Sequence, residues 1–321
     1  MRINAYPVVR AEELGVAPDA VKAAIAEIRE THGLELHSFL MLRRGALIWE
    51  EYFRNGEEPR LHALYSVSKS FCSTAIGLAQ AQGLLSVDDK LYDFFPEHAR
   101  LCDSDYKREV TLAHLLMMGS GFENNEGKIF SKDADAMLEA ALSMPIVHKP
   151  GTVFDYYTLG TYLLSVAFSK VCPEGIHAYL RRKLFGPMGF GKSKWDMDSK
   201  KTPMGGFGLH LTAYDLSRLG QLYLQKGCWE GQRLLPESYA AAATSGQISN
   251  ANHPSGNPDW TSGYGYQFWR NRMGGFRADG MYGQYIIVLP EKEAVIVMTS
   301  HLKDMQMPLT AIETMLYPEI K

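Results

Sequence analysis

The sequence predicts a mixed α/β (α+β) fold in which one antiparallel sheet is built from both ends of the chain. Two strand-like segments lie near the start of the 321 residues and three lie near the end, whereas the residues between them are mostly helical or loop. A single sheet covered by the terminal helices accounts for this order. We therefore expect a sheet-containing α/β domain from residues 1–83 and 245–321, with an inserted, mostly helical domain at 84–244.

The N-terminal part predicts a helix followed by a hairpin. Residues 19–32 carry apolar side chains at helical spacing, and Gly33 follows where a helix would end. Residues 36–42 and 46–53 are strand-like, and Gly45 lies in the short turn between them. This hairpin supplies the N-terminal strands of the expected sheet.

The middle and the end of the chain follow the same periodicity rules. Further helices are predicted at 66–82, 112–118, 132–142, 159–171 and 213–225. Residues 245–263 are rich in Ser, Asn, Gly and Pro and predict an ordered loop. Strands are predicted at 264–270, 284–289 and 294–300, and a last helix at 305–316.

Composition excludes several function classes. The formal net charge of −3 and the lack of a basic tract argue against nucleic acid or an acidic membrane surface as a partner. The sequence contains neither an apolar signal-like segment at its start nor a run of about 18 apolar residues. The spacing of the four cysteines is neither paired nor metal-like, so we expect a reduced, cytoplasmic setting. These cysteines are Cys72, Cys102, Cys172 and Cys228.

The central motif is Ser-x-x-Lys at the start of the helix predicted at 66–82. Positions three apart share a helix face, so Ser66 and Lys69 are expected to be neighbours. A serine hydroxyl becomes a good nucleophile when a base removes its proton, and burial in an apolar helix favours a neutral lysine that can do so. The simpler alternative is a helix cap followed by a surface lysine. A second copy, from Ser104 to Lys107, lies in a polar stretch and is interpreted as chance.

Other candidate sites are weaker. The His, Asp and Glu residues show no metal-ligand spacing, so neither a metal nor another cofactor is expected. The glycine-rich segment at 205–208 lacks the Lys-Ser/Thr partner of a phosphate-binding loop. His114, His210 and His301 are interpreted as structural or surface residues.

Several segments together resemble the serine hydrolase superfamily of class C β-lactamases, DD-peptidases (penicillin-binding proteins) and related esterases and amide hydrolases. The resemblance runs from about residue 30 to 316 and implies a β-lactamase/transpeptidase-like fold. The matching segments are Tyr65-Ser66-Val67-Ser68-Lys69-Ser70-Phe71, Gly83-Leu84-Leu85-Ser86-Val87-Asp88-Asp89, His114-Leu115-Leu116-Met117-Met118-Gly119-Ser120-Gly121, Pro150-Gly151-Thr152-Val153-Phe154-Asp155-Tyr156, and the end from Gly280 to Ser300.

The resemblance implies acyl transfer through a covalent acyl-enzyme. Ser66 matches the nucleophile and Lys69 its lysine partner, while Tyr156 takes the place of the tyrosine that passes the proton to the leaving group. Tyr157 is the alternative if the register is shifted by one. By analogy, the backbone N–H groups of Ser66 and Met281 form the oxyanion hole.

Two of the three family motifs are altered. Thr158 replaces the asparagine of Tyr-x-Asn, which removes an amide from substrate binding. Ala278-Asp279-Gly280 replaces Lys-Thr-Gly, so the lysine that binds a substrate carboxylate is missing. Arg277, Arg270 or His301 are possible replacements. Asp279 either orients a catalytic group or a substrate amine, or it holds the strand end, and Gly280 allows substrate close to the strand.

We expect a cofactor-free hydrolase that acts on a small ester or amide, with Trp260 and Tyr264 as candidate walls of the substrate pocket. Core packing is the alternative for Tyr264. One alternative function is a β-lactamase or D-alanyl-D-alanine carboxypeptidase. The other is a catalytically silent binding module on the same fold, favoured by the changes at Thr158 and Ala278.

Overall fold

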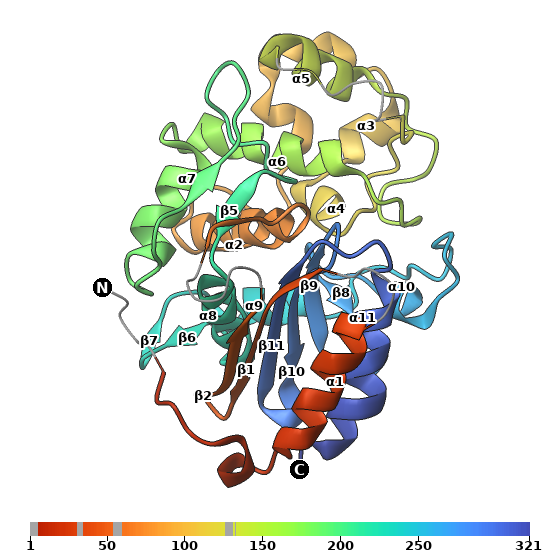
Figure 1. The fold of residues 1–321 in the computed structure, drawn as a ribbon. Coiled ribbons are helices and arrows are strands. Elements are labelled where there is room, and N and C mark those ends of the chain that lie inside the picture. The colour runs from red at the N-terminus through yellow and green to blue at the C-terminus, as the bar shows by residue number, and fades with distance from the viewer. Residues whose placement is uncertain (1–5, 31–34, 54–59, 126–130, 132) are drawn as a thin grey trace.

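The computed structural model of the chain describes residues 6–30, 35–53, 60–125, 131 and 133–321. At its centre is a six-stranded antiparallel sheet with the strand order β2-β1-β11-β10-β9-β8. Two strands come from the start of the chain and four from its end, which confirms the predicted sheet (Figure 1). The strands are β1 (Leu36–Arg43), β2 (Ala46–Tyr52), β8 (Trp269–Arg270), β9 (Phe276–Gly280), β10 (Gln284–Leu289) and β11 (Ala294–Ser300).

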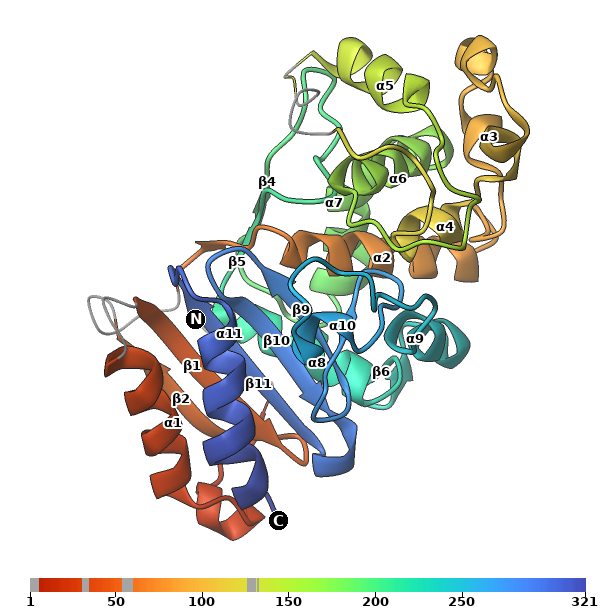
Figure 2. The same cartoon turned by 90° about the vertical axis from the view of Figure 1, so that its right-hand side faces the viewer.

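Alternate side chains of the central strands enter two separate hydrophobic cores, as the two-residue period of a strand requires. On β10, Ile286 and Val288 belong to one core, whereas Tyr285 and Ile287 belong to the other. The first core lies between the sheet and the helices α2 (Val67–Ala81) and α8 (Ala213–Leu224). The second lies beneath α1 (Pro18–Glu30) and α11 (Gln306–Ala311), which cover the outer face of the sheet together (Figures 1 and 2).

Most of the remaining helices form a layer above the sheet in Figures 1 and 2, and α2 lies between this layer and the strands. This layer also contains short strands that sequence periodicity did not predict. The helices of the layer are α3 (Asp105–Glu109), α4 (Leu112–Leu116), α5 (Ala134–Ser143), α6 (Thr158–Val171) and α7 (Gly175–Leu180). The other short elements are β3 (His62–Ala63), β4 (Lys194–Trp195), β5 (Leu209–Leu211), β6 (Cys228–Trp229), β7 (Gln232–Arg233), α9 (Glu237–Thr244) and α10 (Pro258–Thr261).

Helix α8 lies within the segment predicted as an inserted domain, yet it packs directly on the sheet. A Cβ atom added to Gly220 would lie 2.5 Å from Val295 Cγ1 and 2.8 Å from Ile286 Cγ2. The lack of a side chain at Gly220 therefore sets how closely the helix approaches the strands. The division of the chain at residues 84 and 244 stays a prediction.

The strand predicted at 264–270 is wrong for most of its length, because β8 contains only Trp269 and Arg270. The chain turns sharply at Gln267, whose φ of 67° lies in the left-handed region. The buried Gln267 side chain donates hydrogen bonds to the carbonyls of Leu115 and Leu116 and accepts one from Thr161. Gln267 thus joins the sheet to the helical layer instead of continuing a strand.

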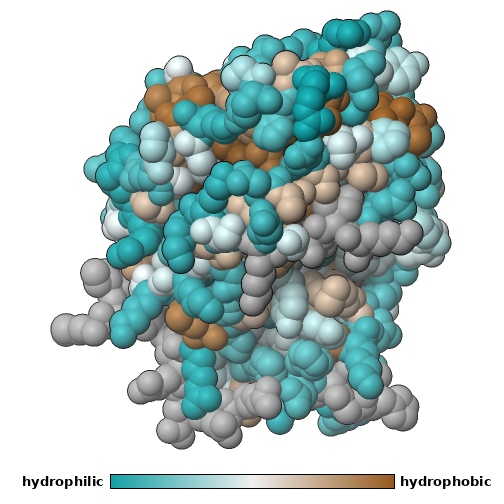
Figure 3. Space-filling model, turned by 90° about the horizontal axis from the view of Figure 1, so that it is seen from above, coloured by the Kyte–Doolittle hydropathy of each residue, from teal (hydrophilic) through white to brown (hydrophobic). Residues whose placement is uncertain are grey.

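The face of the helical layer seen from above is mostly hydrophilic, and its hydrophobic residues appear as separate groups (Figure 3). Isolated apolar side chains of this kind are normal for a protein surface. Within the described ranges, the helices are too short or too polar to cross a membrane.

Candidate active site

The start of α2 is held in a constrained conformation. Tyr65 has a φ of 47°, a left-handed value that is unfavourable for a residue with a side chain, and Ser66 follows it directly. The Leu64 N–H donates to Leu209 O on β5, and the Tyr65 ring packs edge-on against Tyr282 at 5.2 Å. These neighbours fix where the chain enters the helix and place Ser66 at its first turn.

Lys69 is buried, with about 1 % of its surface exposed, so the alternative of a surface lysine is wrong. Its Nζ donates to Ser66 Oγ at 3.0 Å and to the Gly206 carbonyl at 2.9 Å. A Cβ atom on Gly206 would lie 3.4 Å from Nζ and 2.7 Å from Thr158 Cγ2. The close approach of this glycine therefore fixes the orientation of the Lys69 ammonium group toward Ser66.

The second Ser-x-x-Lys copy shows a different geometry. Ser104 caps α3 by accepting a hydrogen bond from the Lys107 backbone N–H at 3.3 Å. The Lys107 ammonium group instead bonds the Leu101 carbonyl at 2.9 Å and pairs with Asp103 at 3.2 Å. The shared sequence pattern thus describes a capping serine here and a serine–lysine pair on α2.

Tyr156 lies beside the serine–lysine pair. The centroid of its ring is 4.9 Å from Lys69 Nζ, and the ring stacks on Trp269 at 5.5 Å. Tyr157, the alternative in a shifted register, is buried against Phe122. Thr158 begins α6 and contacts the chain at Gly206, so the three motif positions Ser66, Lys69 and Tyr156 gather with Thr158 at one place.

The end of β9 packs against the start of α2. A Cβ atom added to Gly280 would lie 2.3 Å from Leu64 O and 3.1 Å from Ser66 N. Glycine is required at this contact because backbone meets backbone. Met281 comes next in the chain with an exposed side chain, so its backbone is adjacent to this contact.

Asp279 is buried and forms an ion pair with the fully buried Arg277. Arg277 Nε donates to Asp279 Oδ2 at 3.0 Å. Burial raises the pKa of the Asp279 carboxyl to about 6, although Arg277 and the more distant Lys69 act in the opposite direction. Arg277 is therefore engaged by an internal carboxylate. Of the other candidate cations, Arg270 bonds the Thr244 carbonyl, and the His301 ring stacks on Tyr282.

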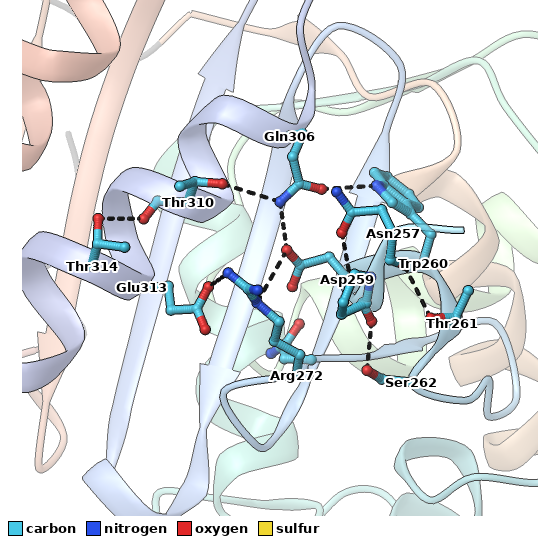
Figure 4. Close-up of polar contacts among 12 residues, drawn as sticks. Asn257, Asp259, Trp260, Thr261, Ser262, Arg272, Gln306, Thr310, Glu313 and Thr314 are labelled. Carbon is cyan, nitrogen blue, oxygen red and sulfur yellow. Dashed lines mark hydrogen bonds and ion pairs between the residues drawn. The ribbon is translucent and has the colours of Figure 1, made fainter. Parts of the chain in front are cut away.

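Trp260 covers the ion pair. The Arg277 guanidinium lies 4.6 Å from the centre of its ring, and Trp269 packs edge-on against it at 5.1 Å. Figure 4 shows how α11 holds this side chain. Gln306 Oε1 accepts from Trp260 Nε1 at 3.2 Å, while Gln306 Nε2 donates to the buried Asp259 at 2.5 Å. The position of Trp260 over the ion pair thus depends on the C-terminal helix.

Tyr264 is buried, with about 1 % exposure, and packs edge-on against Tyr156 and Trp269 at 6.2 and 4.9 Å. It supports the tyrosine from behind, which agrees with the core-packing alternative.

Sequence reasoning missed the contact of Gly206 with Lys69, and it did not pair Arg277 with Asp279. The one available signal was the i, i+2 spacing of Arg277 and Asp279 on a strand, which places both side chains on the same face.

The other histidines and acidic residues do not gather into a metal site: the described ranges contain no group of three or more His, Cys, Asp or Glu side chains that could hold a metal ion.

His114 caps α4 together with Thr111, and its Nδ1 accepts the Thr111 N–H at 3.1 Å. Burial lowers the pKa of this imidazole. Its geometry fits the structural role that the sequence suggested.

Comparisons with known proteins place this geometry in context. The 6-aminohexanoate-dimer hydrolase of Paenarthrobacter ureafaciens is 25% identical over 295 residues, which cover 83% of this chain and 73% of that protein. The octameric penicillin-binding protein homologue from Pyrococcus abyssi superposes with a TM-score of 0.75 at 19% identity, covering 93% of this chain and 78% of that one. A family VIII carboxylesterase superposes with a TM-score of 0.70 at 15% identity, covering 94% and 98%.

The solved structures are related to this chain by their fold, and they share its β-lactamase/transpeptidase-like architecture. The Beta-lactamase family model matches residues 21–312, which include every part of the site described above. The chain therefore belongs to the Beta-lactamase family of hydrolases.

Proposed function

We propose that the chain hydrolyses a small ester or amide and that Ser66 is the nucleophile. The observation that carries this proposal is the 3.0 Å contact between Lys69 Nζ and Ser66 Oγ at the buried start of α2. The relatives named above include an amide hydrolase and a carboxylesterase, which supports this substrate class.

In the first half-reaction, Ser66 Oγ forms a bond to the substrate carbonyl carbon while its proton passes to neutral Lys69. The negative charge that develops on the carbonyl oxygen is bound by the backbone N–H groups of Ser66 and Met281. The bond to the leaving group then breaks, and the proton reaches the leaving group through Lys69 and Tyr156. An acyl group remains on Ser66.

In the second half-reaction, water attacks the acyl carbon. Its proton is taken up by the Lys69–Tyr156 pair, the bond to Ser66 Oγ breaks, and the serine recovers a proton from the same pair. This cycle needs only the protein's own groups. The Gly206 carbonyl serves it by holding one N–H of Lys69, so that the side-chain nitrogen stays directed toward Ser66.

Turnover of β-lactams or D-alanyl peptides is the less favoured activity. Both substrates carry a carboxylate, and the family lysine that receives it is replaced by Ala278. The buried Arg277 precedes this position on β9, and Asp279 already pairs with it. A chromogenic cephalosporin therefore serves as a comparison substrate, and we expect its turnover to be far slower than that of a short-chain ester.

The test is intact mass spectrometry after reaction with a fluorophosphonate, which loses fluoride as it bonds to an activated serine. We expect one adduct on the wild type and none on Ser66→Ala, whose esterase rate should fall at least about 10³-fold. The matched control is Ser104→Ala in the second Ser-x-x-Lys copy, which should label like the wild type. Labelling of Ser66→Ala, or no labelling of the wild type, would overturn the proposal.

A further inference from the structure

A surface cleft of about 350 Å³ adjoins the candidate site and shares Tyr156 with it. The cleft lies between the segment that leads into Tyr156 and the loop that contains Asn252 and His253, and Asn124 and Asp155 also line it. Because Tyr156 forms part of the wall of the cleft, a substrate group that passes this tyrosine enters the cleft. The polar side chains of the cleft therefore indicate which chemical groups of a substrate can bind there.

The two amides in the cleft donate hydrogen bonds to neighbouring groups of the protein. Asn124 Nδ2 donates to Asp155 Oδ1 at 2.8 Å and to the Tyr156 carbonyl at 3.0 Å. Asn252 Nδ2 donates to the Phe154 carbonyl at 2.9 Å. These bonds use both N–H groups of Asn124 and one of the two N–H groups of Asn252, and they fix the orientation of each amide so that its oxygen is an acceptor for a ligand. Both asparagines consequently present acceptors.

His253 presents a single donor. Its Nδ1 accepts the Ser255 backbone N–H at 3.3 Å, so in the neutral ring the proton resides on Nε2. Burial lowers the pKa of this imidazole, which favours the neutral form. The ring is held flat against Trp260 and edge-on to Trp269. Its orientation is therefore fixed by the same aromatic group that packs behind Tyr156.

The charge of the cleft is negative. Among the described residues that line it, Asp155 is the one carboxylate and there is no lysine or arginine; the lining otherwise holds two histidines, amides, a tyrosine and apolar groups. One oxygen of Asp155 is bonded to Asn124. The Asp155 carboxylate gives the cleft its negative charge, and the two amide oxygens add acceptors beside it.

We propose that this cleft receives the leaving group of the substrate and selects one that carries an alkylammonium. The inference rests on the proposed function, in which Tyr156 delivers the proton to the leaving group and so places that group along its own side chain. An ammonium supplies a positive charge for the Asp155 carboxylate and N–H donors for the amide oxygens beside it. A leaving group with a carboxylate meets repulsion from Asp155.

The test uses three butanoate esters of similar leaving-group size: 2-(dimethylamino)ethyl, 3-methylbutyl and 2-carboxyethyl. The measured quantity is the ratio of kcat/KM for the ammonium ester to that for the neutral 3-methylbutyl ester. An exposed charge pair is worth up to about 1 kcal/mol, so Asp155→Asn should lower this ratio about two- to fivefold. The esters differ in intrinsic reactivity, but this difference affects the ratio of wild type and variant equally. A change in the ratio between the two proteins therefore measures the effect of Asp155 alone.

Two further variants complete the design. Asp105→Asn removes an equal charge from an exposed carboxylate on α3 and should leave the ratio unchanged. Asn252→Asp adds a carboxylate to the cleft and should raise the ratio, and this expected gain does not depend on the stability of the Asp155 variant. Equal ratios in all four proteins, or a preference for the 2-carboxyethyl ester, would overturn the proposal.

Failure of the two proposals can be told apart. If fluorophosphonate labels Ser66 and the neutral ester is hydrolysed without any effect of Asp155, the cleft proposal alone is wrong. If Ser66 is not labelled and all three esters stay intact, the proposed function is wrong and the cleft proposal is rejected with it.

Discussion

At the scale of single residues, Asp279 is the most unusual group beside the serine. Its carboxyl is buried, pairs with Arg277 and has its pKa raised from 3.8 to about 6. In the unfolded chain the same carboxyl ionises at about pH 4. Between about pH 4 and 6 the native state retains a proton that the unfolded state has released, so the free energy of unfolding falls as the pH rises.

This linkage gives a prediction for Asp279→Asn, which cannot ionise. The contribution of Asp279 to the stability of the wild type is fully present only below about pH 4, is mostly present at pH 4 and should be lost by pH 7, a change of about 2–3 kcal/mol between these two pH values. The difference in free energy of unfolding between wild type and variant should shift by that amount in urea titrations at the two pH values. Asp19→Asn, at an exposed position on α1, is the control. Parallel curves for wild type and Asp279→Asn would contradict the argument.

At the scale of elements, the C-terminal helix and the loop around α10 act as one unit. Gln306 bonds Trp260 and Asp259, and Arg272, which precedes β9, pairs with Glu313 of the turn that extends α11 (Figure 4). Trp260 in turn covers Arg277. The helix therefore supports the aromatic side chain that covers the Arg277–Asp279 pair, although it contributes none of Ser66, Lys69 and Tyr156.

Gln306→Leu should break this support with little change in volume. The buried Asp259 loses a donor, so the free energy of unfolding should fall by about 1–3 kcal/mol. Trp260 loses its anchor over Arg277, so the kcat/KM for the best ester should fall as well. Thermal unfolding and steady-state kinetics measure the two effects. Thr314→Val is the matched control on the same helical segment, because Thr314 bonds only the Thr310 carbonyl. Equal kinetics for both variants would exclude a supporting role for α11.

At the scale of the whole molecule, periodicity predicted a sheet built from both ends of the chain, because the apolar pattern of each strand is a local property of the sequence. The start of α2 was predictable for the same reason, since Ser66 and Lys69 are one helical turn apart. The contacts that complete the site are not local. Gly206 reaches Lys69 from 137 positions away, and only folding brings its carbonyl there. The strand at 264–270 was predicted too long because the turn at Gln267 is fixed by bonds to α4 and α6.

The contact between the end of β9 and the start of α2 joins segments from the two ends of the chain. Gly280 lies at the end of β9, and a methyl group there would come within 2.3 Å of Leu64 O and 3.1 Å of Ser66 N. The backbone cannot yield as a flexible side chain can, so Gly280→Ala should push β9 away from α2. The Ser66 and Met281 N–H groups would then be spaced wrongly for one oxygen. We expect fluorophosphonate labelling to slow on the order of 10²–10³-fold, with a loss of about 1–3 kcal/mol in stability.

The control for this substitution is Gly246→Ala, where the added methyl group meets no atom of the described structure within 4 Å. It should label at the wild-type rate, and circular dichroism should show both variants folded at the assay temperature. In the proposed mechanism β9 and α2 together supply the oxyanion hole, so the labelling rate should report on the contact between them. Wild-type labelling by a folded Gly280→Ala protein would mean that the reactivity of Ser66 depends on α2 alone, with β9 serving only the sheet.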